Sequence, residues 1–440
     1  MPYIPITGKN KEEMLACLGL KGVGELFSSV PAKAWLKEKI NLPFPLSEID
    51  IKKEIGALAK KNANADDFLS FLGAGSYNHF IPSVVKHIIS RSEFYTAYTP
   101  YQPEISQGML QSIFEYQSLI CNLTGMEIAN ASMYDGATAL AEAASLAVNF
   151  TKKRKILIAK TVHPHSRQVL QTYANGANWQ IEEIDFDTKT GITKDFGVSP
   201  KIAAVIIQQP NFFGCLEDNL NFADKIHAAG ALYIVSADPI SLGLLKPPGE
   251  YGADIVVGEG QALGNPQSFG GPGLGIFAVK KDFMRLIPGR IVGETVDAEG
   301  KRGFVLTLQT REQHIRREKA SSNICSNEAL NALAACVYLT YLGPQGLKQV
   351  ASACLENANY LKEKLLAQGF ESPFSAPFFK EFVVKAKEAP IKINQRLLEN
   401  KIIGGLDLET YYPQLKNHML FCTTEMINRS EIDKLVSLLN

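Results

Sequence analysis

Short apolar runs separated by amphipathic stretches fill the middle of the chain. The runs are continuous rather than alternating in polarity, which is typical of strands in a mostly parallel sheet buried on both faces. They are KILIAK (155–160), IEEIDFD (181–187), AAVIIQQP (203–210), ALYIVSAD (231–238), DIVVGEG (254–260) and GLGIFAVK (273–280). Helical stretches lie between them, so the pattern predicts a doubly wound α/β domain.

The first ninety residues follow a different pattern. In KEEMLACLGL, PAKAWLKEKI and SEIDIKKEIGALAKK, apolar residues recur at spacings of three and four, as on one face of a helix. Proline-bearing pieces separate these stretches, and Ser47 with Asp50 has the spacing of a helix-capping box. We therefore expect short helices joined by turns, forming an N-terminal extension that lies on the main body or on a partner.

After the α/β pattern, a long helix is expected over about residues 327–342. The strands FFKEFVVKA (378–386) and HMLFCTTE (418–425) then alternate with helices, and the chain ends in the helical SEIDKLVSLLN. The sequence therefore predicts three parts: a helical N-terminal extension (1–90), a large α/β domain (91–343) and a small C-terminal α+β domain (344–440).

Composition narrows the functional classes. Of the 440 residues 46% are apolar, enough for a large core, and 45 basic residues balance 45 acidic ones. This balance gives no reason to expect binding to nucleic acid or to an anionic membrane. The N-terminus lacks the pattern of a signal peptide and no uncharged apolar window spans a bilayer, so we expect a cytoplasmic protein. The seven cysteines are scattered without a CxxC pair, which disfavours a zinc site or a disulfide framework.

Ligands of doubly wound domains bind outside the carboxyl ends of the strands, where four features of this chain should meet. Gly136, Ala137 and Thr138 stand at a helix start whose N–H groups suit a phosphate, with Ser132 as a further hydroxyl donor; plain packing of small residues is the alternative. Asp238 closes the strand ALYIVSAD, where a carboxylate can pair with a protonated ring nitrogen or cap a turn.

Two histidines and a glycine-rich loop complete the set. His163 and His165 follow the strand KILIAK, where they can stack on a flat ligand or hold a loop, and a metal-binding pair lacks an evident third ligand. The glycine-rich loop runs from Gly258 to Gly275. Rival nucleotide motifs are weak, because GLGIFA (273–278) lies inside an apolar strand and no G-x-x-x-x-G-K-[ST] sequence occurs.

Several long runs of the sequence match one family. They are FYTAYTPYQPEISQG, ASMYDGATALAEA, TVHPHSRQVLQTY, DPISLG with PPGEYGADI, FGGPGLG and TREQHIRREKASSNICSN. The order of phosphate turn, loop histidine, strand-end aspartate and glycine-rich loop resembles the fold type I pyridoxal-phosphate enzymes. The runs themselves resemble the P protein of the glycine cleavage system, and most closely subunit 1 (alpha) of its two-chain form, over essentially the whole chain.

This resemblance implies a subunit of an enzyme, glycine dehydrogenase (decarboxylating). Glycine would form an imine with pyridoxal phosphate and lose CO2, and its aminomethyl group would pass to the lipoyl arm of H protein. The cofactor ring acts as an electron sink, which a protonated ring nitrogen held by an aspartate improves. The implied fold is a fold type I large domain with a mostly parallel sheet.

The sequence departs from the family's catalytic half at the Schiff-base lysine. No lysine lies between Lys246 and Lys280, and the resemblance places Gln261 at the lysine's position, five residues before Pro266. A neutral amide cannot form an imine, so the resemblance implies that a homologous beta subunit holds the cofactor covalently, in an α2β2 assembly. This chain's own site would then be vestigial; its residues are Gly136, Ala137, Thr138, His163, Asp238 and Gln261.

The resemblance also implies that this chain forms the opposite wall of the partner's cofactor cleft. The candidates near the reaction are Tyr95, Tyr98, Tyr101, Gln102, Glu104, Arg311 and His314. The candidates for contact with the partner's cofactor are Arg316, Arg317, Lys319, Ser321, Ser322 and Asn323, from the basic stretch 301–323. The alternatives are an aromatic loop that packs on the core, a basic stretch that is a solvated helical face, and arginines that guide glycine or an acidic H protein surface.

Two other functions stay open at this point. A self-sufficient pyridoxal-phosphate enzyme would use another lysine, and Lys246 and Lys280 are nearest in the sequence. A non-catalytic scaffold or regulatory subunit would stabilise the beta subunit without touching the cofactor.

Overall fold

The computed structural model describes residues 5–36, 38, 40–218 and 221–439. The chain forms two compact units, Met1–Asn62 and Ala63–Asn440. The three-part division expected from the sequence is finer than this and stays a prediction. Within the described ranges, no helix has both the length and the hydropathy that a bilayer crossing requires. A cytoplasmic location likewise stays a prediction.

The described residues of the first unit form two α-helices, α1 (Gly8–Cys17) and α2 (Glu48–Ala59). Thr7 caps α1 and Ser47 caps α2, each by accepting a hydrogen bond from the backbone N–H three residues on, and the predicted start of α2 at Ser47 is confirmed. None of the described residues of this unit is buried, and Phe44 is 94% exposed. The apolar side chains of this unit therefore form no core of their own.

The centre of the second unit is a seven-stranded sheet. Its strands, in spatial order, are β2 (Ile128–Ala129), β8 (Gly275–Val279), β7 (Ile255–Glu259), β6 (Leu232–Ala237), β5 (Ile202–Gln209), β3 (Lys155–Ala159) and β4 (Gln180–Ile184). The five strands from β4 to β7 run parallel, whereas β8 runs antiparallel to both of its neighbours. The reversal follows from the link after β7, which contains no crossover helix. The mostly parallel sheet and each of the predicted strands within it are confirmed.

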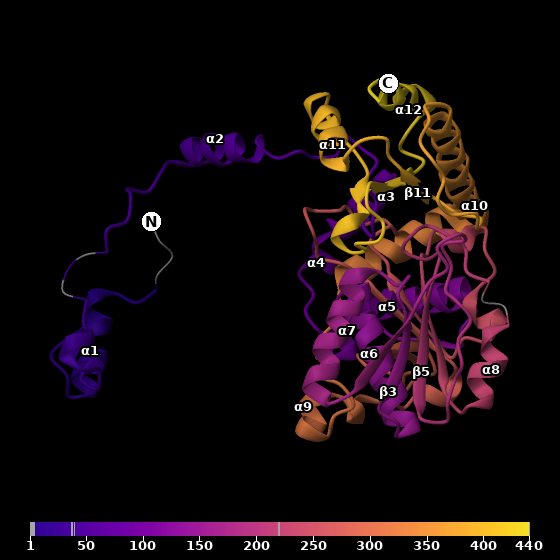
Figure 1. Cartoon of the computed structure of the whole chain (residues 1–440). Helices are drawn as coiled ribbons and strands as arrows, with labels where there is room; N and C mark the ends of the chain where they lie inside the picture. Colours follow the sequence, from indigo (N-terminus) through magenta and orange to yellow (C-terminus); the bar gives the residue numbers. More distant parts are fainter. Residues whose placement is uncertain (1–4, 37, 39, 219–220, 440) are drawn as a thin grey trace. The chain divides into compact units, whose positions relative to one another are not determined.

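Helices cover this sheet. Figure 1 shows α6 (Gly136–Thr151) and α7 (Pro164–Ala177) side by side along it. Buried alanines bring α6 close to β7 and β8. The long helix expected near residues 327–342 is α10 (Ala329–Ala367), which kinks at Gly343, directly before Pro344. The other helices before it are α3 (Ser83–Ile89), α4 (Ser92–Tyr95), α5 (Gln107–Thr124), α8 (Phe222–Ala228) and α9 (Gln313–Arg316).

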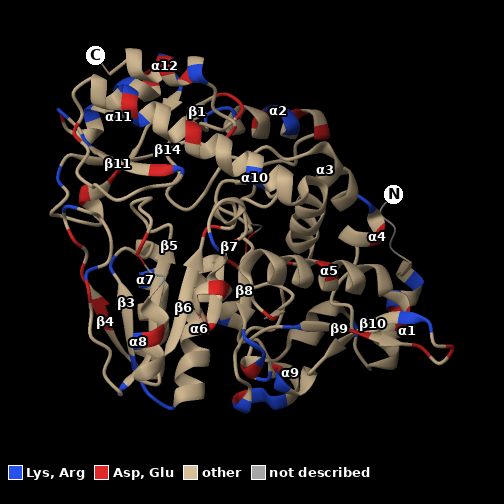
Figure 2. Cartoon of the chain, turned by 90° about the vertical axis from the view of Figure 1, so that its right-hand side faces the viewer, with Lys and Arg blue, Asp and Glu red and all other residues tan. Residues whose placement is uncertain are grey.

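The C-terminal part has its own sheet and core, gathered at one end of the second unit (Figures 1 and 2). Its antiparallel strands are β11 (Glu381–Lys385), β14 (His418–Cys422) and β13 (Leu406–Asp407), with helices α11 (Pro390–Glu399) and α12 (Arg429–Ser437). A two-residue strand, β12 (Ile402–Ile403), pairs in parallel with β1 (Leu69–Ser70). The start of the second unit therefore lies beside the C-terminal part.

The basic stretch 301–323 is only partly helical. It begins in a hairpin of β9 (Ile291–Val296) and β10 (Arg302–Thr307), and α-helix is limited to the four residues of α9, with short 3₁₀ turns on either side. Because the direction of the chain changes several times here, neighbouring side chains point into different surroundings.

Candidate functional site

A cavity of about 310 Å³ opens at the carboxyl ends of the parallel strands. It lies where ligands of doubly wound folds bind. The structure brings five of the predicted residues together in its lining, namely Gly136, Ala137, His163, His165 and Asp238. Thr138 belongs to the same helix start, and Gln261 follows β7 beside the cavity.

Two carboxylates occupy the start of α6. The Asp135 carboxylate caps the helix by accepting a hydrogen bond from the Thr138 N–H (2.7 Å). The Glu259 carboxylate accepts from the N–H groups of Gly136, Gln261 and Leu274, each at 2.9 Å. Burial raises the pKa of Glu259, although these three N–H groups and their dipoles favour its charged form. The helix start that the sequence offers to a phosphate is therefore already filled by negatively charged groups.

The strand-end aspartate is paired with a lysine of the same chain. Asp238 Oδ2 lies 2.6 Å from the ammonium of Lys380, whose side chain is 1% exposed. Its other oxygen accepts from the Ile240 N–H (2.9 Å). The Lys380 Nζ is also 3.4 Å from the centre of the Tyr77 ring and 3.4 Å from His79 Nε2. Burial alone would lower the pKa of Lys380, but the Asp238 carboxylate outweighs it and the pKa is raised.

Residues 74–80 (AGSYNHF), named the strap here, cross this region between the sheet and the C-terminal part. Glu381 accepts from the Ala74 N–H (2.6 Å) and from the Tyr77 hydroxyl (2.9 Å). Gln261 accepts from the Tyr77 N–H (3.0 Å) and donates to the Tyr77 carbonyl (3.1 Å). His163 Nε2 contacts the Ala74 carbonyl oxygen (2.9 Å). Sheet and C-terminal part therefore hold the same segment.

The histidine and the glutamine have clear structural roles in this arrangement. Burial lowers the pKa of His163 to about 4, so its imidazole is neutral and Nε2 donates to the strap. Gln261 also donates to the Asn265 carbonyl (2.7 Å), so its amide is fully used within the chain. His165 contacts the Tyr411 hydroxyl (3.0 Å) instead of the strap.

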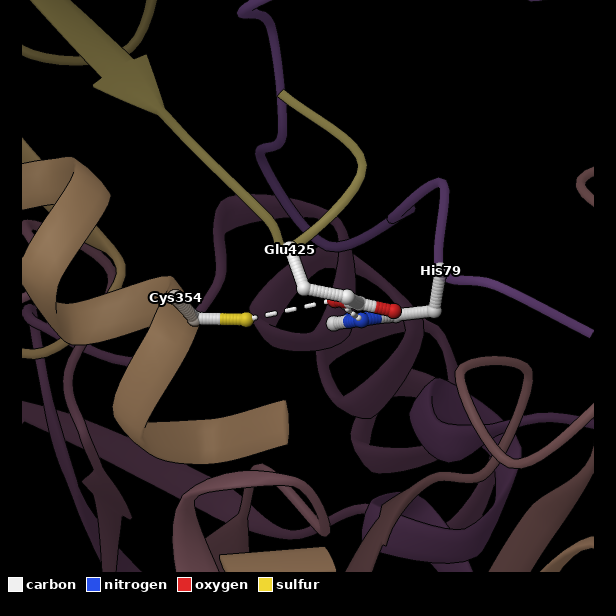
Figure 3. A group of neighbouring side chains, drawn as sticks. All are labelled: His79, Cys354 and Glu425. Atoms are coloured by element: carbon white, nitrogen blue, oxygen red, sulfur yellow. Dashed lines mark hydrogen bonds and ion pairs between the residues drawn. The ribbon is translucent and has the colours of Figure 1, made fainter. Parts of the chain in front are cut away.

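A second cluster, drawn in Figure 3, continues from the strap toward α10. His79 Nδ1 lies 2.8 Å from a Glu425 oxygen, and the Cys354 sulfur lies 3.4 Å from the same oxygen. These residue types can bind a metal, and their ligand atoms lie within 4.8 Å of one another. Because Lys380 donates to Nε2, however, the proton of His79 sits on Nδ1 and is directed at Glu425. Burial also raises the pKa of Cys354, so the geometry favours a hydrogen-bonded cluster over a metal site.

The aromatic loop and the basic stretch meet at one point. The Tyr101 hydroxyl accepts from Arg290 Nη2 (3.0 Å), and the Tyr101 ring lies edge-on to His314, with centroids 5.8 Å apart. One carboxylate oxygen of Glu312 lies 3.8 Å from Arg290 Nε and 3.5 Å from His314 Nδ1, so Glu312 contacts both of the residues that contact Tyr101. The structure thus joins two regions that the sequence analysis proposed separately.

The other residues of the aromatic loop lie on the surface. Tyr95 is the last residue of α4, and Tyr98 is 84% exposed. Gln102 precedes a single 3₁₀ turn that contains Glu104, and both side chains are exposed. The aromatic loop therefore does not pack on the core, and Tyr101, which is 45% exposed, is held at the surface by Arg290.

The cations of the basic stretch divide into two kinds. Arg311 turns inward, and its guanidinium donates to the backbone carbonyls of Leu308, Gly289 and Ile287. Arg316, Arg317 and Lys319 are exposed around α9, where Figure 2 shows Lys and Arg residues gathered along the ribbon. An open depression of about 580 Å³ lies here, lined in part by His314, Arg317, Ser322 and Asn323. Ser321 is half-buried next to it.

Neither lysine suggested by the sequence reaches the cavity. Lys280 donates to Asp254 (2.5 Å), which precedes β7 and so lies at the opposite end of that strand. Lys246 is exposed. The sequence analysis missed Lys380 and Glu259, although each left a signal. FFKEF places a lysine and a glutamate inside an apolar strand, and DIVVGEG closes a buried strand with an acid.

Comparison with known proteins agrees with this fold. A family model described as "Glycine cleavage system P-protein" matches residues 1–439. The chain belongs to the P-protein family. A relative from Desulforamulus reducens, named "Probable glycine dehydrogenase (decarboxylating) subunit 1", is 55% identical, and the match covers 99% of each chain. A relative of the same name from Carboxydothermus hydrogenoformans is 54% identical over 100% of this chain and 99% of its own length.

Solved structures place the P-protein fold among the fold type I pyridoxal-phosphate enzymes. The crystal structure of a glycine decarboxylase (P-protein) of the glycine cleavage system, in inhibitor-bound form, has a TM-score of 0.92 at 45% identity and covers 100% of this chain and 99% of its own. A sphingosine-1-phosphate lyase from Burkholderia pseudomallei, with a TM-score of 0.64 at 14% identity over 93% of each chain, shares the fold alone. The predicted family and fold class are confirmed.

The cofactor implied by the P-protein fold does not fit the charges of this chain's own cavity. Its phosphate would meet Asp135 and Glu259 at the start of α6. Its ring nitrogen would meet an aspartate that is already paired with Lys380. None of the described residues that line the cavity is a lysine that could hold its aldehyde as an imine. No step of a reaction is therefore assigned to this cavity.

Proposed function

We propose that this chain is the alpha subunit of a two-chain glycine decarboxylase. Together with a beta subunit it decarboxylates glycine and passes the aminomethyl group to the lipoyl arm of H protein. Membership of the P-protein family and the relatives named subunit 1 support this function. The observation that supports the division of labour is that the amide of Gln261, the residue that the resemblance aligns with the imine-forming lysine, is bound to the strap.

In this proposal the beta subunit holds pyridoxal phosphate on its own lysine, and the two kinds of chain assemble as α2β2. This chain supplies the facing wall of the cleft. Two kinds of exposed side chain support this proposal: the aromatic rings of Tyr95 and Tyr98, and the cations of Arg316, Arg317 and Lys319. Aromatic side chains exclude water, and cations attract the carboxylate of glycine or a phosphate.

Tyr101 and His314 form the part of this wall with a defined geometry. Arg290, which is 3% exposed, fixes the Tyr101 hydroxyl, and Glu312 contacts both Arg290 and His314. Arg311 holds the turn between the hairpin and α9 through its three carbonyl contacts. We therefore assign Arg311 a positioning role, and the exposed cations after it the role of facing the partner.

Glycine–CO2 exchange tests the proposal. Exchange is expected only when this chain and a beta subunit are mixed, with neither chain active alone. Replacing Tyr98 by alanine should lower the exchange rate at least about tenfold if the side chain shapes the cleft. Tyr341, which is 64% exposed on α10, provides a matched control, and its alanine variant should exchange at the wild-type rate.

The same assay separates an enzyme subunit from a scaffold. A scaffold has no side chain in the cleft, so Tyr98→Ala and Arg316→Ala would leave exchange unchanged while the assembly stays intact by size-exclusion chromatography. Activity of this chain without a partner would contradict the proposal altogether.

A further inference from the structure

Two side chains at the cavity, Glu259 in its lining and Lys380 behind Asp238, carry charges of the kind that a bound cofactor would bring. We infer that Lys380 and Glu259 are internal replacements for the ring nitrogen and the phosphate of pyridoxal phosphate, and that they occupy the groups that would bind the cofactor and so exclude it from the cavity. The inference goes beyond the proposed function and rests on it only for the identity of the excluded ligand.

Lys380 satisfies Asp238 completely. An ammonium has three N–H donors, and those of Lys380 have three acceptors: the Asp238 carboxylate (2.6 Å), His79 Nε2 (3.4 Å) and the face of the Tyr77 ring (3.4 Å to the centroid). The second Asp238 oxygen accepts from backbone N–H groups of the following turn. A protonated ring would have to displace a desolvated ammonium from a desolvated carboxylate, and both charges would then need new partners.

At the other end of the site, Glu259 occupies backbone N–H groups that would otherwise be free for a phosphate. Phosphate binding at a helix start depends on N–H groups that point outward and on the positive end of the dipole. Here the Gly136 N–H points at Glu259, the Thr138 N–H points at Asp135, and two further N–H groups saturate Glu259. A doubly charged phosphate would face two carboxylates at this helix start, so like-charge repulsion opposes its entry.

The same side chains connect the site to the strap. Lys380 lies directly before β11 and contacts two strap residues, Tyr77 and His79, while the next residue, Glu381, binds the Ala74 N–H and the Tyr77 hydroxyl. Gln261 holds both backbone groups of Tyr77 from the side of the sheet. The Asp238–Lys380 pair therefore joins the sheet edge, the strap and the C-terminal part in one buried network.

The first test is direct binding of pyridoxal phosphate to the full-length chain. Equilibrium dialysis of the purified chain should show no saturable binding, and the reconstituted complex should hold one cofactor for each alpha–beta pair. Saturable binding by the isolated chain, or two cofactors for each pair, would overturn the inference. Because glycine–CO2 exchange is measured separately, a complex that exchanges while the isolated chain binds cofactor would refute only this inference. A complex that does not exchange would refute the proposed function alone.

The second test measures the internal pair itself. Lys380→Met removes the ammonium that pairs with the Asp238 carboxylate, whose side chain is only 13% exposed, so the melting temperature should fall on the order of 10 °C. Lys385→Met is the matched control, because Lys385 ends β11, the strand that begins directly after Lys380, and pairs at the surface with Glu371 (3.1 Å). Its melting temperature should be nearly unchanged. Equal melting temperatures for the two variants would overturn the inference.

A small amine distinguishes the charge of Lys380 from its packing. In Lys380→Ala, n-propylammonium replaces the missing atoms and should restore part of the lost melting temperature. 1-Propanol, which is similar in size but neutral, should restore none. If propanol restores the melting temperature as well as the amine does, Lys380 acts by filling space. The inference that its charge takes the place of the protonated ring nitrogen would then be wrong.

Discussion

The buried carboxyl group of Glu381 should make the folded chain less stable as the pH rises through neutrality. Its carboxyl group is buried at the strap, where it accepts from the Ala74 N–H and the Tyr77 hydroxyl. Burial raises its pKa from 4.5 to about 7, although the ammonium of Lys380 and the two hydrogen bonds oppose the shift. The folded chain therefore holds a proton on Glu381 in a pH range where the unfolded chain has released it.

The sign and size of the effect follow from this difference. A group whose pKa is higher in the folded state stabilises the fold fully below its unfolded pKa, and this stabilisation is lost as the pH rises through the folded pKa. A shift from 4.5 to about 7, at 1.36 kcal/mol per pKa unit, corresponds to about 3 kcal/mol. Glu381→Gln keeps the shape and removes the titration. The free energy of unfolding of the wild type, minus that of the variant, should fall by about this amount between pH 4.5 and pH 8.

Urea unfolding of both proteins across this pH range measures the difference. Glu371→Gln is the control, since Glu371 is an exposed carboxylate that pairs with Lys385 at the end of β11, and the difference of this variant from wild type should be nearly independent of pH. A wild-type advantage over Glu381→Gln that grows with pH would refute the reasoning. It would show that Lys380 keeps Glu381 ionised in the folded chain.

Three further predictions follow from the structure. Gly214→Ala should lower the free energy of unfolding by at least about 2 kcal/mol, because Gly214 has a φ of 80° and a Cβ there would lie 1.8 Å from the Glu381 carbonyl oxygen. Urea unfolding checks this, and the control is Gly176→Ala, at an exposed position in α7, which should be neutral or stabilising. Arg290→Met should remove the support of Tyr101 and leave Glu312 with His314 as its remaining partner. Both glycine–CO2 exchange and stability should fall, the latter by about 3 kcal/mol, whereas unchanged exchange in an assembled complex would refute the role of this cluster. In the native chain a thiol reagent should rapidly modify only the exposed Cys17 and Cys325, because burial raises the pKa of Cys215 to about 12; rapid modification of Cys215, read by peptide mass spectrometry, would contradict the packing described for it.

The sequence could predict the sheet because its strands are buried on both faces, and such strands are continuous apolar runs. It could also predict that Gly136, His163 and Asp238 lie together, since each follows or closes an element that ends at the same edge. Both inferences depend on local pattern and on one rule of the fold.

The contents of the site could not be predicted in the same way. Lys380 pairs with Asp238 from a strand that is 142 residues further along the chain, and nothing local to Asp238 indicates it. The strap is likewise held by residues far away in the sequence, since Glu381 binds the Ala74 N–H and Glu425 binds the Phe80 N–H. The inward turn of Arg311 follows Leu308, whose φ of 53° reverses the chain, a conformation that the residue type does not indicate. Long-range pairing and local reversals of direction therefore account for the differences.

The central claim is that this chain completes a site whose imine-forming lysine belongs to another chain. Borohydride reduction of the reconstituted complex in the presence of pyridoxal phosphate, followed by peptide mapping, tests it most directly. The account predicts that the reduced cofactor is found on a lysine of the beta subunit and on no lysine of this chain. Stoichiometric label on any lysine of this chain, and above all on Lys380, would contradict it.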